Sequence, residues 1–241
     1  MKLSQLLSLL GAAAIAPFAS AVEYNQSITA IYGSGNPSGG WTTDSGDRGL
    51  LLGLRAKNRT NGSTTNVNGT YSFATAPATR GLWNYEFSIG SGDLFLDAYD
   101  YFLSVDRDSS QGVSFSTIDP LSYWFDNSFG TGATLSGQGV EGVASNFVDD
   151  HTVAQNSQNI TFGNYPIFPM GALPLEANAT YTYELFAVAK GSGIDGSRLA
   201  SVSIDVVVGQ GGARVPDAAS TAGLLGAALA GLAFVRNRRR R

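Results

Sequence analysis

The chain offers few side chains that could carry out nucleophilic catalysis. It has no cysteine and one histidine, His151, which follows Asp149 and Asp150. A serine hydrolase needs a nucleophile, a base and an orienting acid in one place, and the Gly-x-Ser-x-Gly turn that often presents the serine is missing. A single histidine in an acidic stretch is more often a solvated surface residue. We therefore predict no catalytic role for His151.

Paired carboxylates are the next candidate chemistry. Glycoside hydrolysis needs two acidic groups a few ångströms apart across a cleft. Glu86 and Glu184 both lie in stretches that alternate apolar and polar residues. Each falls on the polar side of its stretch, where a solvated glutamate is the ordinary expectation. The prediction is that the chain is not an enzyme.

Aspartates crowd into one stretch and raise the question of a calcium site: Asp93, Asp97, Asp100, Asp106 and Asp108. Oxygen-rich loops can hold calcium, but the EF-hand pattern and the repeats of calcium-loaded β-rolls are both missing. We expect Asp97 and Asp100 on opposite faces of a strand, which separates them. A structural calcium at 106–110 stays open, with Asp44 and Asp47 as a weaker alternative. The main prediction is no metal and no cofactor.

Tryptophans could stack on sugar rings. Trp83 alternates with core-type residues and is expected to be buried, whereas Trp41 and Trp124 fall in expected loops or at strand ends. Exposed aromatics on a shallow face would make a carbohydrate-binding β-sandwich module associated with exopolysaccharide. This is the alternative function.

The elements that must position these residues are strands. Period-two alternation marks four stretches and is typical of half-buried strands: 82–89, 98–105, 181–189 and 199–208. Shorter candidates are 27–32, 49–57, 70–75, 113–117 and 158–162. Turn dipeptides separate the runs, and Ser91-Gly92-Asp93 is expected to close an antiparallel pair. Short strands with one polar face predict an all-β body, an antiparallel, jelly-roll-like β-sandwich over 22–209.

The start of the chain predicts export. A positive charge at Lys2 precedes a short apolar run, and Ala19-Ser20-Ala21 forms an Ala-x-Ala cleavage site. These features predict a secretory signal peptide at 1–21, removed by signal peptidase. Without Lys2 and the five tail arginines, 9 basic residues remain against 19 acidic ones. Such a surface repels nucleic acid, so no nucleic-acid partner is expected.

The end of the chain predicts a membrane anchor. Residues 218–235 carry no charge, and a helix of about 18 residues would be about 27 Å long, close to the thickness of a thin bilayer core. Five arginines follow, at Arg236, Arg238, Arg239, Arg240 and Arg241. Arginines stay on the cytoplasmic side. We predict a linker at 210–217, one transmembrane helix at 218–235 and a cytoplasmic Arg cluster at 236–241, with the body outside the cytoplasm.

The tail also resembles a known family. Val215-Pro216-Asp217, the Gly/Ala/Leu-rich stretch and the arginines together resemble the PEP-CTERM sorting signal in its VPD variant, VPDSG-CTERM-like. The resemblance implies that exosortase, a membrane-embedded cysteine transpeptidase-like enzyme, recognises Val215, Pro216 and Asp217 and removes the tail. Short sequence segments of the body, at 69–73 and 83–87, resemble an uncharacterised group of exported PEP-CTERM proteins. This resemblance implies no particular activity.

These observations lead to one functional prediction. The chain is expected to be an exported, non-enzymatic protein that moves from the inner membrane to the cell surface or extracellular matrix. Its expected partners are signal peptidase, exosortase, the membrane through 218–235, and exopolysaccharide as a further candidate. A plain single-pass anchor is the simpler interpretation of the same tail.

Overall fold

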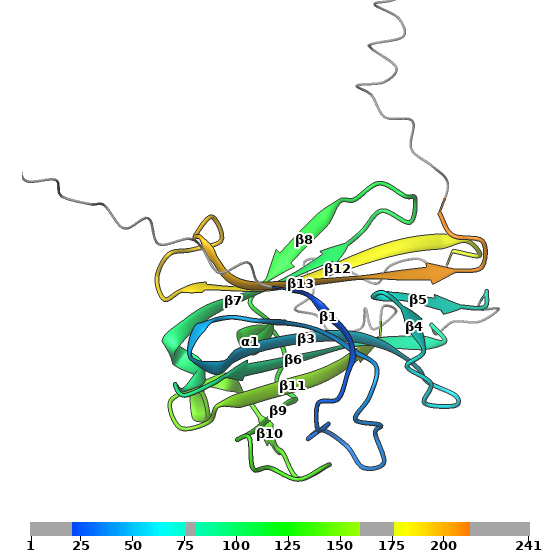
Figure 1. Cartoon of the computed structure of the whole chain (residues 1–241). Helices are drawn as coiled ribbons and strands as arrows, with labels where there is room; N and C mark the ends of the chain where they lie inside the picture. Colours follow the sequence, from blue (N-terminus) through cyan, green and yellow to red (C-terminus); the bar gives the residue numbers. More distant parts are fainter. Residues whose placement is uncertain (1–20, 76–80, 160–175, 213–241) are drawn as a thin grey trace, which may run out of the picture.

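Two β-sheets lie face to face in the computed structural model, which describes residues 21–75, 81–159 and 176–212 (Figure 1). The lower sheet in Figure 1 has seven strands in the order β1-β2-β3-β6-β11-β9-β10. The upper sheet has six, in the order β4-β5-β13-β12-β7-β8. The all-β prediction is confirmed, and the layered arrangement is that of a sandwich.

The seven-stranded sheet consists of β1 (Glu23–Gln26), β2 (Trp41–Ser45), β3 (Leu50–Asn58), β6 (Trp83–Ser91), β9 (Asn127–Gly130), β10 (Val140–Gly142) and β11 (Val153–Asn159). The six-stranded sheet consists of β4 (Asn66–Val67), β5 (Thr70–Phe73), β7 (Tyr99–Asp106), β8 (Phe115–Ile118), β12 (Ala179–Ala189) and β13 (Arg198–Val208). The helical turns are η1 (Asp47–Gly49), η2 (Leu96–Ala98), α1 (Pro120–Tyr123) and η3 (Ala144–Asn146).

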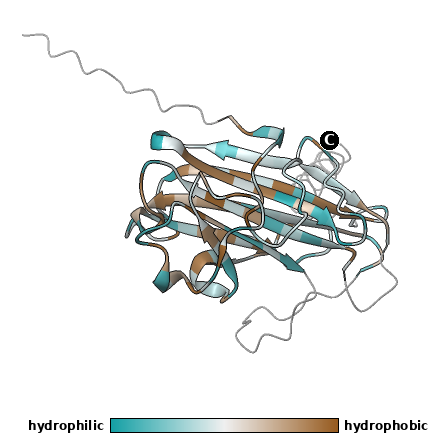
Figure 2. Ribbon diagram, turned by 90° about the horizontal axis from the view of Figure 1, so that it is seen from below, coloured by the Kyte–Doolittle hydropathy of each residue, from teal (hydrophilic) through white to brown (hydrophobic). Residues whose placement is uncertain are grey.

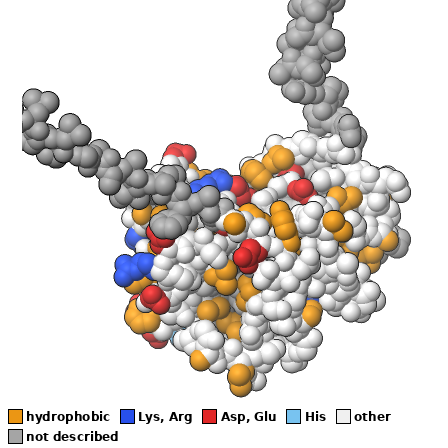
Figure 3. Space-filling model, viewed as in Figure 1, with side chains coloured by type: hydrophobic (Ala, Val, Ile, Leu, Met, Phe, Trp, Pro, Cys, Tyr) orange, Lys and Arg blue, Asp and Glu red, His pale blue; other side chains and the backbone are white. Residues whose placement is uncertain are grey.

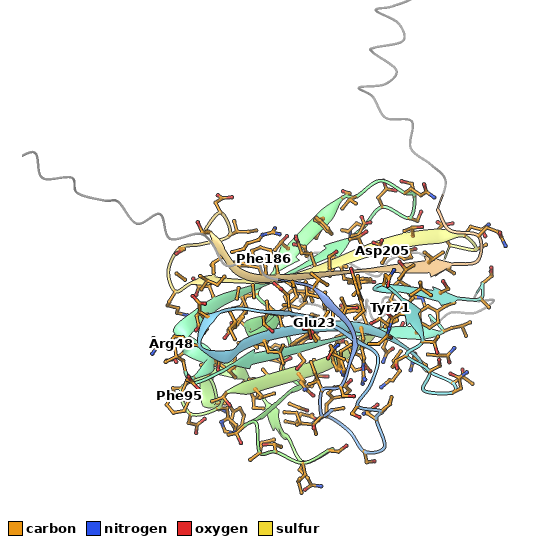
Figure 4. All side chains as sticks on the ribbon, in the orientation of Figure 1. Glu23, Arg48, Tyr71, Phe95, Phe186 and Asp205 are labelled. Atoms are coloured by element: carbon orange, nitrogen blue, oxygen red, sulfur yellow. The ribbon has the colours of Figure 1, made fainter. Side chains whose placement is uncertain are left out.

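The core lies between the sheets and is rich in aromatic rings. Alternate residues of β6 and β12 point inward, as the period of two requires. Tyr85 of β6 stacks on Tyr183 of β12 with ring centroids 4.6 Å apart, and Trp83 meets Tyr183 edge-on at 5.9 Å. Tyr71 lies between the sheets (Figure 4) and its hydroxyl donates to the Gly40 carbonyl at 2.5 Å. Figure 2 shows the apolar stretches running along the strands.

Two connections differ from the sequence prediction. β13 pairs with β5 in parallel, from Asp205–Thr70 to Val208–Phe73, so the upper sheet is mixed rather than antiparallel. The Ser91-Gly92-Asp93 turn does not close a hairpin, because β6 and β7 belong to different sheets. Gly92 has φ 69° and lies against the Arg48–Gly49 backbone, where a Cβ would collide. This turn therefore carries the chain from one layer to the other.

The stretch 27–32 is not a strand, contrary to prediction. A short strand, β1, precedes it, and residues 27–40 run irregularly over the outer face of the seven-stranded sheet. Its backbone bonds to a loop and to a side chain: the amides of Gly137 and Gly139 donate to the carbonyls of Ala30 and Ile31 at 3.0 and 2.8 Å. Gln155 Oε1 accepts from the Ile31 amide at 2.8 Å. Gln155 Nε2 also donates to the Thr29 carbonyl at 2.9 Å. One glutamine side chain and two loop amides thus bond to backbone groups that a neighbouring strand would otherwise pair.

Candidate functional site

His151 lies against aromatic rings and not in open solvent. Its side chain is 20% exposed and bonds to the Asp150 carboxylate. Phe147 and Phe129 meet its ring edge-on, at 5.3 Å and 6.4 Å. Within the described residues, no serine hydroxyl is hydrogen-bonded to its ring, so the structure brings no nucleophile to this histidine.

Glu86 and Glu184 do not form a catalytic pair. Glu86 lies on β6 next to inward-facing Tyr85, and Glu184 lies on β12 next to inward-facing Tyr183. Each glutamate therefore points away from the core, on the outer side of its own sheet. The two outer sides are separated by the whole sandwich, so no cleft lies between these carboxylates.

Glu86 is fully buried, which corrects the expectation of a solvated glutamate. Its carboxylate accepts from Arg55 Nε at 2.6 Å, from the Tyr32 hydroxyl at 2.5 Å and from Ser157 Oγ at 2.8 Å. Lys57 Nζ lies 2.5 Å from its second oxygen. These five residues, Tyr32, Arg55, Lys57, Glu86 and Ser157, form the Glu86 cluster. Arg55 and Glu86 are directly opposite each other on β3 and β6.

The Glu86 cluster fastens the N-terminal segment onto the sheet. Arg55 Nη1 donates to the carbonyls of Pro37 and Gly39 at 2.7 and 2.8 Å. The guanidinium also lies 4.2 Å from the centre of the Trp41 ring, a cation–π distance. Every charged group of the cluster is thus paired inside the protein, as buried charges require. This arrangement explains a structural role and leaves no free acid or base.

The electrostatics of the cluster favour an ionised Glu86. Burial alone raises the pKa of this carboxyl, but the positive charges of Arg55 and Lys57 and the hydrogen bonds from Lys57 and Tyr32 outweigh it and lower the pKa below its usual value. Burial, together with the negative charge of Glu86, raises the pKa of the Tyr32 hydroxyl well above its ordinary value. Tyr32 therefore remains a neutral donor to the carboxylate.

All three tryptophans are buried, at 0% (Trp41), 2% (Trp83) and 2% (Trp124) exposure. The burial of Trp83 is confirmed. The expected location of Trp41 and Trp124 in loops or at strand ends is confirmed, because Trp41 begins β2 and Trp124 follows α1, but both rings are buried, Trp41 under the N-terminal segment and Trp124 beside Phe87. The predicted tryptophan platform for sugars does not exist.

The aspartates of 106–110 organise a turn. Asp106 Oδ1 accepts from the amides of Asp108 and Ser114 at 2.9 and 2.8 Å. Asp108 Oδ1 accepts from the Ser110 amide at 2.9 Å. These hydrogen bonds give both aspartates a structural role, because they hold the loop between β7 and β8 in one shape.

The weaker calcium candidates also have other contacts or stand apart. Asp44 is buried in β2 and its Oδ2 accepts from the Ser201 amide at 2.6 Å. Asp47 begins η1. In the parts of the chain that the structure describes, no group of three or more His, Cys, Asp or Glu side chains is placed to hold a metal ion.

A cavity of about 350 Å³ lies beside the first half of β7 and between α1 and η3. Its walls include three carboxylates, two of which have structural partners. Asp100 pairs with Lys190 at 3.0 Å, and Asp119 caps α1 by accepting from the Leu121 amide at 2.9 Å. Asp97 lies on η2 and not on the strand with Asp100, which corrects the expected strand placement. The cavity thus brings together no free acid–base pair.

The described chain ends in a segment fixed to the body. After β13, the Gly209 amide donates to the Phe73 carbonyl at 2.9 Å. The amides of Gln210 and Gly212 donate to side-chain oxygens of Asn178 and Thr180 at 2.8 and 3.0 Å. The first three residues of the predicted linker are therefore bound to the sandwich.

The predicted sorting and membrane residues lie outside the described residues. These are Ala19, Val215, Pro216, Asp217, the stretch 218–235 and the five terminal arginines; Ala21 is the first residue described. In 21–75, 81–159 and 176–212, no helix has the length and apolar character needed to cross a membrane. The geometry that the structure contributes to this end of the chain is the exit at Gly212.

Comparison with known families decides the nature of the tail. Residues 214–240 match the family model of the VPDSG-CTERM motif. The chain carries a PEP-CTERM-like sorting signal. This signal implies an exported, membrane-associated protein that exosortase processes. A search of curated proteins finds no match for the chain. Because the motif covers the tail alone, the resemblance of the body to an uncharacterised exported group stays a prediction.

Proposed function

We propose that this chain is a non-enzymatic protein of the cell surface or extracellular matrix, delivered there when exosortase cuts off its tail. The observation that carries the proposal is the sorting signal at 214–240. The described body supports it, because the candidate catalytic residues His151, Glu86 and Glu184 lie apart and have structural partners.

The proposed order of events follows from the two ends of the chain. Signal peptidase removes 1–21 after export. The apolar stretch 218–235 then holds the chain in the inner membrane as a single span, and the arginines keep its C-terminus in the cytoplasm. This orientation places Val215, Pro216 and Asp217 at the outer surface, where exosortase recognises them.

The exit at Gly212 sets how far the body can move from that surface. Val215 comes three residues after Gly212, and consecutive Cα atoms lie about 3.8 Å apart, so Val215 stays within about 11 Å of Gly212 and Asp217 within about 19 Å. The folded body therefore remains beside the membrane until the tail is cut.

The test replaces Val215, Pro216 and Asp217 by alanine and follows the tail in cells with and without exosortase. The native chain should lose its tail only when exosortase is present, and the triple variant should keep it in both. Replacing all five terminal arginines by lysine is the matched control, because it keeps the positive charge and should preserve processing. Equal processing of the native chain and the triple variant would leave only a plain anchor.

A further inference from the structure

The loop between β7 and β8 lies beside the point where the chain leaves the body. The Thr180 amide donates to the Ser109 carbonyl at 3.0 Å. Gly212 packs so closely on Ser109 and Ser110 that a Cβ there would collide with their backbone. Figure 1 shows the same neighbourhood: the loop at the right of β8 lies close to the orange end of β13.

This loop and the strand after it, residues 107–118, form the exit hairpin, which carries exposed apolar side chains. Val113 is 53% exposed and Phe115 is 42% exposed. Arg107 and Asp108 are its only charged residues, so its net charge is close to zero. Figure 3 shows that charged side chains are also sparse on the face seen there. Apolar residues on a neutral, serine-rich hairpin suit the boundary between water and lipid.

The hairpin has a fixed shape, so its apolar residues stay displayed. Asp106 and Asp108 accept backbone amides within the loop, and Ser110 Oγ accepts from the Gly112 amide at 2.9 Å. β8 pairs with β7 from Leu103–Ile118 to Asp106–Phe115. It is the last strand of its sheet, and Phe115 lies at its start. Because the hairpin is already ordered, it loses little conformational entropy when it contacts another surface.

The length of the tail brings this hairpin to the membrane. Ala218, where the predicted transmembrane stretch begins, comes six residues after Gly212. At an upper limit of about 3.6 Å per residue, Gly212 lies within about 22 Å of the hydrocarbon boundary. The headgroup layer fills about 5–8 Å of that distance. A surface tethered this closely meets the membrane at high effective concentration, so weak apolar contacts are enough.

We propose that, while the tail is intact, the exit hairpin rests on the outer surface of the membrane, with Val113 and Phe115 entering the lipid interface. The partner is the lipid surface itself. This inference rests on the proposed function because it requires 218–235 to sit in the bilayer. It goes further by assigning the face of the body that touches the membrane and by making that contact end when the tail is removed.

The absence of native cysteine allows a direct test. The single-cysteine variants Val113→Cys and Leu135→Cys each receive an environment-sensitive fluorophore, and the full chain is placed in vesicles of neutral phospholipid that contain a quencher lipid. Leu135 is the matched control, because it is 72% exposed and lies between β9 and β10 on the other sheet. Flotation with the vesicles first establishes that the chain is anchored.

For the anchored chain, the probe at 113 should shift its emission to the blue and lose intensity to the quencher lipid, and the probe at 135 should do neither. Cutting the tail should return the probe at 113 to its emission in water. Adding Phe115→Ser to the Val113→Cys chain should reduce both effects. Equal responses at 113 and 135 in anchored chain would overturn the inference, as would a response at 113 that requires exosortase. A chain that fails to float would refute the anchor itself, a separate result.

Discussion

Replacing Glu86 by glutamine should destabilise the protein more than any change at the other candidate glutamate. The substitution keeps the size of the side chain but removes the charge that neutralises Arg55, which is fully buried, and Lys57, whose side chain is 12% exposed. Removing one partner of a buried ion pair typically costs about 3–5 kcal/mol, because the other charge stays buried and unpaired. We expect a loss of that size in the free energy of unfolding.

The assay is urea unfolding of the purified chain, followed by tryptophan fluorescence. With a urea dependence of about 2 kcal/mol per molar, the midpoint of Glu86→Gln should fall by about 2 M. Glu184→Gln is the matched control. Glu184 pairs with Arg198 at a partly exposed site, where such pairs contribute about 0–1 kcal/mol. Midpoints that shift equally in the two variants would refute the structural role assigned to the Glu86 cluster.

The same cluster predicts a dependence on pH. Arg55 and Lys57 hold the pKa of Glu86 below its usual value in the folded protein despite the opposing effect of burial. Because the folded-state pKa is depressed, the stabilisation is complete above the unfolded pKa, about 4.3 for glutamate, and is lost as the pH falls through the folded pKa. Unfolding midpoints of the native chain should therefore drop in acid, and Glu86→Gln should flatten this part of the curve. An unchanged acid slope in the variant would contradict the prediction.

Two further substitutions test the exit and the core. Gly212→Ala should speed hydrogen exchange at the backbone amide of residue 212, because the added Cβ would collide with the Ser109 backbone. Gly132→Ala is the control: nothing lies within 4 Å of the added carbon, so exchange at the amide of residue 212 should not change. Tyr183→Phe should leave the melting temperature unchanged or raise it, because the buried Tyr183 hydroxyl has no hydrogen-bond partner in the described structure. A lower melting temperature for Tyr183→Phe would show that this hydroxyl is stabilising.

Alternation of residue types was enough to predict the inner faces of several strands. Trp83, Tyr85 and Phe87 of β6 are buried as the pattern indicated, and so are Val202 and Ile204 of β13. Such a pattern is local, and one buried face enforces it along the whole strand. The same information does not say which strands are neighbours. The parallel pairing of β5 with β13 and the change of sheet at Gly92 both depend on contacts between distant segments.

The Glu86 cluster was missed because its members come from four separate parts of the chain. A signal was present: Arg55 and Lys57 lie two residues apart in an otherwise apolar strand, so they share one face. Glu86 lies opposite Arg55 only because of the register between β3 and β6, which the sequence alone does not give. Both side chains are buried because the N-terminal segment covers them. Reading Glu86 as solvated failed because the second face of this sheet is covered as well.

The tail could be interpreted from the sequence because its signal consists of short segments that follow one another along the chain. A short motif, an apolar stretch and a basic end in a fixed order are enough to match a sorting signal at 214–240. The candidates for chemistry in the body could be judged only by where folding placed them.

The most direct test of the account is the intact mass and C-terminal peptide of the protein recovered from its native cells and medium. We expect a body that begins near Val22 and ends near Val215 to Asp217, that lacks 218–241, and whose C-terminal end depends on exosortase. Recovery of the protein only in the membrane fraction, with Arg241 still at its end, would contradict it.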